Sequence, residues 1–217
     1  MARKQAAASR IRSRLFLVAP VGLAPERLTE LFDAALLGGD VACLLIAGET
    51  ESSVEALAAA VMPLAAAHNV AVLLDDCPDL ARRIGVDGVQ IGADLSRYQD
   101  VRRMLGTDMI IGAFCAGSRH AAMELGEAGA DFVAFDDIAG DLPEDEDFSL
   151  PVWWSSVFEV PCVALMPSEP EGVRALAAGS VEFVRPSDTM WLSPEAARTM
   201  VSDLNALMDE VASDEAP

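Results

Sequence analysis

Four segments of helical character in this sequence end at a glycine that is followed at once by a short apolar run. The junctions are Gly38-Gly39-Asp40 before VACLLI, Gly85-Val86-Asp87 before GVQI, Gly129-Ala130-Asp131 before FVAF, and Gly179-Ser180 before VEFV. Glycine accepts the left-handed backbone that ends many helices. An unbroken apolar run is typical of a strand that is buried on both faces. The recurrence predicts one helix–strand unit used many times.

Eight apolar runs are candidate strands, and amphipathic stretches separate them. The predicted strands are 15–19, 41–46, 70–74, 88–91, 109–113, 132–135, 162–165 and 181–184. The predicted helices are 25–37, 53–67, 78–84, 98–105, 118–128, 169–178 and 194–211. This alternation predicts a single-domain α/β fold, a (β/α)8 TIM barrel, because right-handed crossovers place every helix outside the ring. A doubly wound open sheet uses the same units, but the strand number and the lack of a glycine-rich first turn favour the barrel.

Two regions fall outside this regular pattern. The acid-rich stretch 136–147 reads as a loop, and the apolar stretch 152–158 after it is short for a helix. The first fourteen residues carry five cations and no acid. They are expected to form a basic tail, although an acid-free start of this kind is also seen in transit peptides. The predicted organisation is a basic tail over 1–14, a barrel over 15–211 and an acidic tail over 212–217.

Composition excludes several classes of partner. The formal charge of −20 repels polyanions, so nucleic acid is not expected to bind. No apolar run reaches the roughly 18 residues of a membrane span, and we expect a cytoplasmic protein without a membrane partner. The four cysteines lack metal-type spacing. Cys43 and Cys162 fall in apolar strands and should be buried, whereas Cys77 and Cys115 follow strands and could be exposed.

The carboxyl ends of the predicted strands define where a site can lie, because barrel enzymes carry their chemistry there. We expect a small molecule to bind at this barrel mouth. The predicted ligand-binding residues are Glu49, Asp75, Asp76, Gln90, Cys115, Asp136, Asp137 and Arg185. This set is strongly acidic, contains one cation and lacks histidine.

The stretch VLLDDCPDLARRIGVDGVQIG, residues 72–92, resembles the family of thiamine-phosphate synthases and thiazole tautomerases. Members of that family read close to INDRVDLALAVGADGVHLGQ at this point. Weaker matches extend the resemblance over about residues 15–205. It implies a (β/α)8 barrel that joins a pyrimidine pyrophosphate to a thiazole phosphate and so forms thiamine phosphate. It also implies Mg²⁺ on the pyrophosphate, held here by Asp76 after the third strand and by Asp94 after the fourth.

Other positions at the mouth depart from the family pattern. Leu45, Ala47 and Glu49 stand where the family has glutamine, arginine and lysine on the pyrophosphate. The stretch 136–141 contains no lysine, whereas the family carries one there. In the glycine-rich phosphate turn after strand seven, this chain has Met166-Pro167. Proline lacks the N–H that would bind a phosphate. These departures remove most of the pyrophosphate- and phosphate-binding groups.

Three hypotheses about function follow. The first is a thiamine-phosphate synthase whose cations are Arg97, Arg119 and Arg185. The second is a pseudoenzyme, that is, a non-catalytic or repurposed barrel that binds a small ligand or a partner protein. In it, the tryptophans at 153, 154 and 191 either form a contact surface or pack the barrel. The third is an acidic mouth that holds a divalent cation, with a solvated acidic rim as the alternative. A homo-oligomer is possible under each of them.

Overall fold

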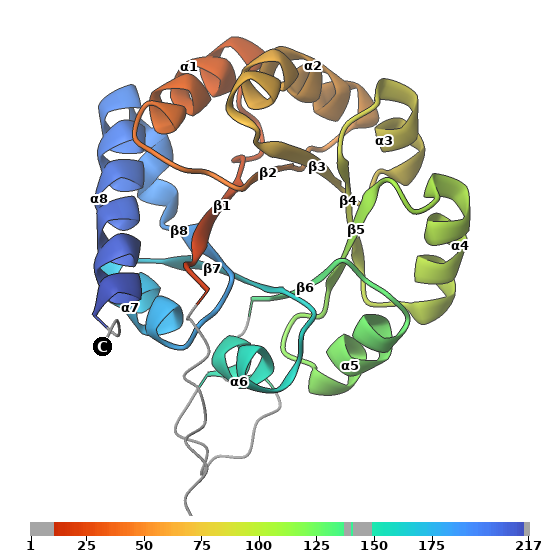
Figure 1. The fold of residues 1–217 in the computed structure, drawn as a ribbon. Coiled ribbons are helices and arrows are strands. Elements are labelled where there is room, and N and C mark those ends of the chain that lie inside the picture. The colour runs from red at the N-terminus through yellow and green to blue at the C-terminus, as the bar shows by residue number, and fades with distance from the viewer. Residues whose placement is uncertain (1–10, 137–139, 141–148, 215–217) are drawn as a thin grey trace, which may run out of the picture.

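A computed structural model describes residues 11–136, 140 and 149–214 and shows a closed eight-stranded barrel (Figure 1). Each strand pairs in parallel with the next, and the last pairs with the first, so the sheet has no free edge. The strands are β1 (Arg14–Val18), β2 (Cys43–Ile46), β3 (Ala71–Asp75), β4 (Gly88–Gly92), β5 (Ile110–Phe114), β6 (Phe132–Phe135), β7 (Cys162–Ser168) and β8 (Phe183–Pro186). The predicted TIM-barrel fold is confirmed.

Helices surround this barrel and connect successive strands (Figure 1). They are α1 (Pro25–Leu36), α2 (Glu51–His68), α3 (Pro78–Ile84), α4 (Leu95–Leu105), α5 (Arg119–Glu127), α6 (Leu150–Val157), α7 (Pro170–Ala178) and α8 (Pro194–Ser213), with a short 3-10 helix η1 (Asp188–Leu192) before the last. Within the described ranges, no helix is both long enough and apolar enough to cross a membrane.

Helix α6 forms although its sequence is short for a helix. Trp154 anchors it, because its indole Nε1 donates a hydrogen bond to the carbonyl of Val160 at 2.7 Å. The ring of Trp154 is buried and stacks on Phe158 with their centroids 4.0 Å apart. Burial of large aromatic rings therefore supports a helix that intrinsic propensity alone leaves marginal.

The four glycine junctions are confirmed at three positions and corrected at the fourth. Gly39, Gly85 and Gly129 have the positive φ that was expected of them. At the last junction Ser180 adopts the left-handed conformation instead, with φ of 62°, whereas Gly179 has φ of −82°. Gly179 is needed for space, because a Cβ there would lie 2.4 Å from a methyl group of Val152 on α6.

The last strand begins two residues later than the sequence predicts. Val181, the predicted first residue, lies in the turn before β8, where its side chain is buried. Its carbonyl accepts a hydrogen bond from the Ser13 hydroxyl at 2.6 Å. An apolar pattern cannot distinguish this buried turn residue from the start of a buried strand.

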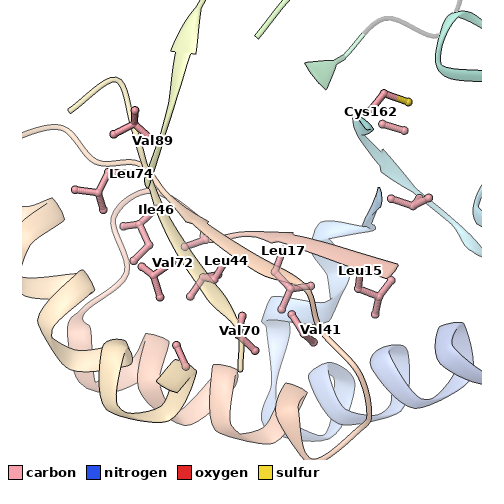
Figure 2. Packing of buried hydrophobic residues seen from close by; sticks show 14 of the residues in the cluster. Leu15, Leu17, Val41, Leu44, Ile46, Val70, Val72, Leu74, Val89 and Cys162 are labelled. Carbon is pink, nitrogen blue, oxygen red and sulfur yellow. The ribbon is translucent and has the colours of Figure 1, made fainter. Parts of the chain in front are cut away.

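Two apolar clusters hold the barrel together. The larger, the outer cluster, lies between strands and helices, and Figure 2 shows Leu17, Leu44 and Val72 on the strand faces that point towards the helices. The smaller, the inner cluster, fills the inside of the barrel with residues such as Phe16 and Phe132, whose ring centroids lie 5.8 Å apart in an edge-to-face contact. Because side chains alternate along a strand, the inward positions also define which residues reach the mouth.

Candidate ligand-binding site at the barrel mouth

The inward-facing series ends in polar side chains at the carboxyl ends of three strands. Ala71 and Leu73 belong to or pack against the inner cluster, so Asp75, two residues further along β3, continues the same face. Phe183 places Arg185 of β8 in the same way. Gln90 of β4 meets Asp75 directly. The mouth therefore has a polar layer above an apolar interior.

Gln90, which is buried, and Asp75, which is half-buried, form a hydrogen-bonded pair. The amide Nε2 of Gln90 donates to Oδ1 of Asp75 at 3.4 Å. Gln90 is only 4% exposed, and its Oε1 is buried without a hydrogen-bond partner in the part of the chain that the structure describes. Burial raises the pKa of the Asp75 carboxyl, the charge of Asp76 raises it further, and the bond from Gln90 partly opposes both effects. The pair thus combines a poorly solvated carboxylate with an unused acceptor.

Asp76 is already engaged by a cation. It adopts a left-handed backbone conformation, with φ of 54°, and its Oδ1 lies 2.5 Å from a guanidinium nitrogen of Arg97. Asp94 is engaged by the same residue, since its Oδ1 accepts the backbone N–H of Arg97 at 2.7 Å and so caps α4. Arg97 therefore contacts both carboxylates that the resemblance implies as metal ligands.

Arg185 is held by Asp188, at the start of η1, and by Leu165 on the neighbouring strand β7. Its Nη2 donates to both carboxylate oxygens of Asp188, at 2.7 and 3.0 Å, and its Nη1 donates to the carbonyl of Leu165 at 3.2 Å. The Nε of Arg185 is buried and has no hydrogen-bond partner among the described residues. The side chain is 20% exposed and that of Asp188 is 56% exposed, so one face of this ion pair borders solvent.

The turn that follows β7 in the family pattern is part of the strand here. β7 runs to Ser168, which pairs with Pro186 of β8 after a register shift. The Ser168 hydroxyl donates to the carbonyl of Met166 at 3.0 Å, and Pro167 between them is exposed. This backbone is extended and lacks one N–H, so it cannot wrap a phosphate as a glycine-rich turn does.

The remaining predicted site residues are spread over the rim and the core. Glu49 and Asp136 are exposed at the ends of β2 and β6. Asp137 lies outside the described residues. The exposure that the sequence leaves open for Cys115 is not observed: it is 3% exposed and packs in the outer cluster, because it follows the inward Phe114. Burial raises the pKa of its thiol to about 12.

The tryptophans at this side of the molecule pack rather than form a surface. Trp154 and Trp191 are buried, and Trp153 packs edge to face on Phe158 at 5.6 Å. The guanidinium of Arg119 lies 5.5 Å from the centroid of the Trp153 ring, in the geometry of a cation–π contact. The third candidate cation of the mouth is thus placed against an aromatic ring.

Two hollows lie away from the mouth. One, of about 400 Å³, is lined by Met62, Asn69, Val86 and their neighbours at the amino-terminal ends of β3 and β4. The other, of about 210 Å³, is lined by inner-cluster side chains such as Cys43 and Phe183. Neither contains a buried side-chain nitrogen or oxygen that lacks a hydrogen-bond partner in the described ranges. The mouth therefore remains the site with unused polar capacity.

Comparison with known proteins agrees with this barrel. The sequence profile of the thiamine monophosphate synthase family matches residues 15–185. The chain belongs to this family. A relative named thiamine-phosphate synthase from Rhodospirillum centenum is 35% identical over 201 residues, which cover 90% of this chain and 97% of the relative. Another from Erythrobacter litoralis is 34% identical and covers 88% of this chain and 94% of its own.

The fold is also that of a solved structure, the thiamine phosphate pyrophosphorylase from Pyrococcus furiosus. Its TM-score to this chain is 0.74, and the alignment covers 93% of this chain and 98% of the other. At 20% identity, this likeness supports the fold alone. The family resemblance predicted from the sequence is therefore confirmed, and the barrel is the family's barrel.

The two carboxylates that thiamine monophosphate synthase family membership implies for Mg²⁺ do not fit that role as they stand, because both are engaged by Arg97. Mg²⁺ is usually held by one or two carboxylates together with water and substrate phosphates. Within the described ranges, no group of three or more histidine, cysteine, aspartate or glutamate side chains is placed to hold a metal. Asp76 instead faces Arg97, and Asp94 caps a helix.

Two ion pairs at the mouth of this family member are not predicted from the sequence. Asp188 is a partner of Arg185, and the only signal for it is the three-residue spacing between opposite charges near a strand end. The pairing of Asp76 with Arg97 carries no sequence signal, because it depends on the left-handed backbone at Asp76. Both features concern which carboxylate neutralises which cation.

Proposed function

We propose that this member of the thiamine monophosphate synthase family binds a small molecule at its barrel mouth without displacing pyrophosphate by the family mechanism. The observation that carries the proposal is the pairing of mouth cations with mouth carboxylates. Arg97 contacts Asp76 at 2.5 Å, and Arg185 contacts Asp188 at 2.7 Å. Each guanidinium charge is therefore balanced by an acid before any anionic substrate arrives.

Departure of pyrophosphate places several negative charges on the leaving group, and cations or metal ions must stabilise them in the transition state. The family supplies cations after its second and sixth strands. In this chain Glu49 is exposed after β2, and residues 136–149 contain seven acids and no lysine or arginine. Negative charge at these positions opposes the charge that develops, so the substitutions act against the reaction.

This chain also lacks the turn that binds the phosphate of the second substrate in the family. In the family a glycine-rich turn after the seventh strand offers backbone N–H groups to that phosphate. Here the strand continues through Pro167, and Ser168 is hydrogen-bonded to its own segment. Loss of this cradle affects a different substrate from the loss of the cations, and both losses point to the same conclusion.

A second candidate function is thiamine-phosphate synthase activity itself. It is favoured by the 35% identity to a relative of that name over nearly the whole chain, and by Asp76 at the position of a metal carboxylate. For this activity Arg97 and Arg185 would have to exchange their carboxylate partners for the pyrophosphate.

A single-turnover assay with purified protein, the pyrimidine pyrophosphate, the thiazole phosphate and Mg²⁺ separates the two candidates. The Rhodospirillum centenum relative, assayed in parallel, is the control for substrates and conditions. We expect no thiamine phosphate above the enzyme-free background from this chain. Formation of thiamine phosphate in proportion to protein concentration would establish the second candidate and overturn the first.

A further inference from the structure

The Asp75–Gln90 pair is the least satisfied polar feature of the described chain. Among the side-chain nitrogen and oxygen atoms of all described residues, only Gln90 Oε1 and Arg185 Nε are buried without a hydrogen-bond partner, and both lie at the mouth. Buried polar atoms are almost always paired, with protein groups or with ordered water. An orphaned acceptor at the bottom of a barrel mouth therefore indicates a donor that the protein itself does not provide.

Among the described residues, Asp75 has no cationic partner either. Its side chain is half-buried and receives a hydrogen bond from Gln90, but no described lysine or arginine forms an ion pair with it. The nearest acid along the chain, Asp76, forms an ion pair with Arg97. A poorly solvated carboxylate without a counter-charge attracts a cation strongly, because little water competes for it.

The two groups select one chemistry. Nε2 of Gln90 already donates to Asp75, so the pair offers acceptors only: the free Oε1 and the carboxylate oxygens. The carboxylate repels an anion, and the described residues place no group of three or more histidine, cysteine, aspartate or glutamate side chains that could hold a metal ion. A planar head with N–H donors on one edge and a delocalised positive charge satisfies both acceptors, as arginine does in bidentate pairs with carboxylates.

We propose that the barrel mouth recognises its ligand through an amidinium-type cationic head that donates N–H groups to Gln90 Oε1 and to the Asp75 carboxylate. This inference rests on the proposed function, namely that the mouth binds a small molecule. It adds that the molecule is a nitrogen-rich cation and not a phosphorylated anion. The acidic rim, with Glu49 and Asp136 exposed, attracts such a ligand over a longer range.

The test is a calorimetric titration of the full chain with benzamidine, a simple amidinium probe, at fixed ionic strength. Tetramethylammonium is the matched probe, because it carries the same charge without N–H donors. Two variants address the pair: Asp75→Asn removes the charge, and Gln90→Met removes the acceptor at similar size. Asp108→Asn is the control, because it removes one charge from an exposed acid just before β5, at the other end of the barrel.

We expect saturable one-to-one binding of benzamidine, at least tenfold weaker binding of tetramethylammonium, and at least tenfold losses in Asp75→Asn and Gln90→Met. Asp108→Asn should stay within about twofold of the parent. Circular dichroism confirms folding, and Asp75→Asn alone decides the matter if Gln90→Met does not fold. Absence of saturable benzamidine binding would mean that only water satisfies Gln90, and equal losses in all variants would mean unspecific attraction to an acidic protein. Either result overturns this inference while leaving the turnover assay, and the proposed function, to be judged separately.

Discussion

Nη2 of Arg185 donates to both carboxylate oxygens of Asp188, while Nε of the same guanidinium is buried without a partner in the described part of the chain. The one inward-facing arginine at the end of β8 is thus neutralised from within its own segment, three residues away. A side chain that could hold an anionic group is instead occupied by a carboxylate.

Asp188→Asn is expected to increase the affinity of the mouth for inorganic phosphate. The substitution removes the negative charge that competes for Arg185, and a partly exposed ion pair is worth up to about 1 kcal/mol, so the gain is about threefold to fivefold. Isothermal titration with phosphate measures it. Asp203→Asn on the exposed side of α8 removes the same charge far along the chain and is the control. Equal gains in both variants, or none in either, would contradict the internal competition.

Asp75→Asn is expected to stabilise the folded protein at neutral pH. The pKa of Asp75 is raised in the fold, mainly by burial, so its contribution to stability is present below the unfolded pKa and is lost as pH rises through the folded pKa. Asparagine removes that loss, and its N–H can pair with Gln90 Oε1, which together should add roughly 0.5–1 kcal/mol at pH 7. Urea unfolding measures the difference, which should shrink as the pH is lowered towards about 4. A variant less stable than the parent at pH 7 would contradict this account.

Gly112→Ala is expected to destabilise the barrel interior. A Cβ at position 112 would lie 1.9 Å from the ring of Phe132, which fills the inner cluster. Overpacking of this kind costs about 1–3 kcal/mol, because the ring must leave its rotamer or the strands must separate. Urea unfolding of this variant is compared with that of Gly92→Ala on β4, where a Cβ meets nothing within 4 Å. Similar losses in the two variants would show that the close contact is not what makes Gly112 necessary.

Most of the fold follows from local pattern. Apolar runs and glycine junctions predict the strand order and the barrel, because burial on both faces of a parallel sheet imposes those patterns. The errors have local causes. Val181 looks like a strand residue because its turn is buried. Gly179 is required because a Cβ there would clash with Val152, and the residue with positive φ at this junction is Ser180.

The candidate site follows from the sequence only in outline. The carboxyl ends of the strands can be predicted, and with them Asp75, Gln90 and Arg185 as mouth residues. The partners of these residues cannot be predicted. Pairing depends on backbone angles at loop residues such as Asp76, and on whether a side chain at a strand end points into the barrel or out of it. Cys115 shows the second effect, since it lies one residue past an inward position and is buried in the outer cluster.

Isothermal titration of the full chain with inorganic pyrophosphate, with and without Mg²⁺, measures whether the mouth cations are already neutralised. We expect no saturable heat in either condition for the parent protein, because Arg97 and Arg185 are paired with Asp76 and Asp188. Saturable binding that requires Mg²⁺ and is lost in Asp76→Asn would contradict this expectation, and would show that Asp76 leaves Arg97 to hold a metal as in the family.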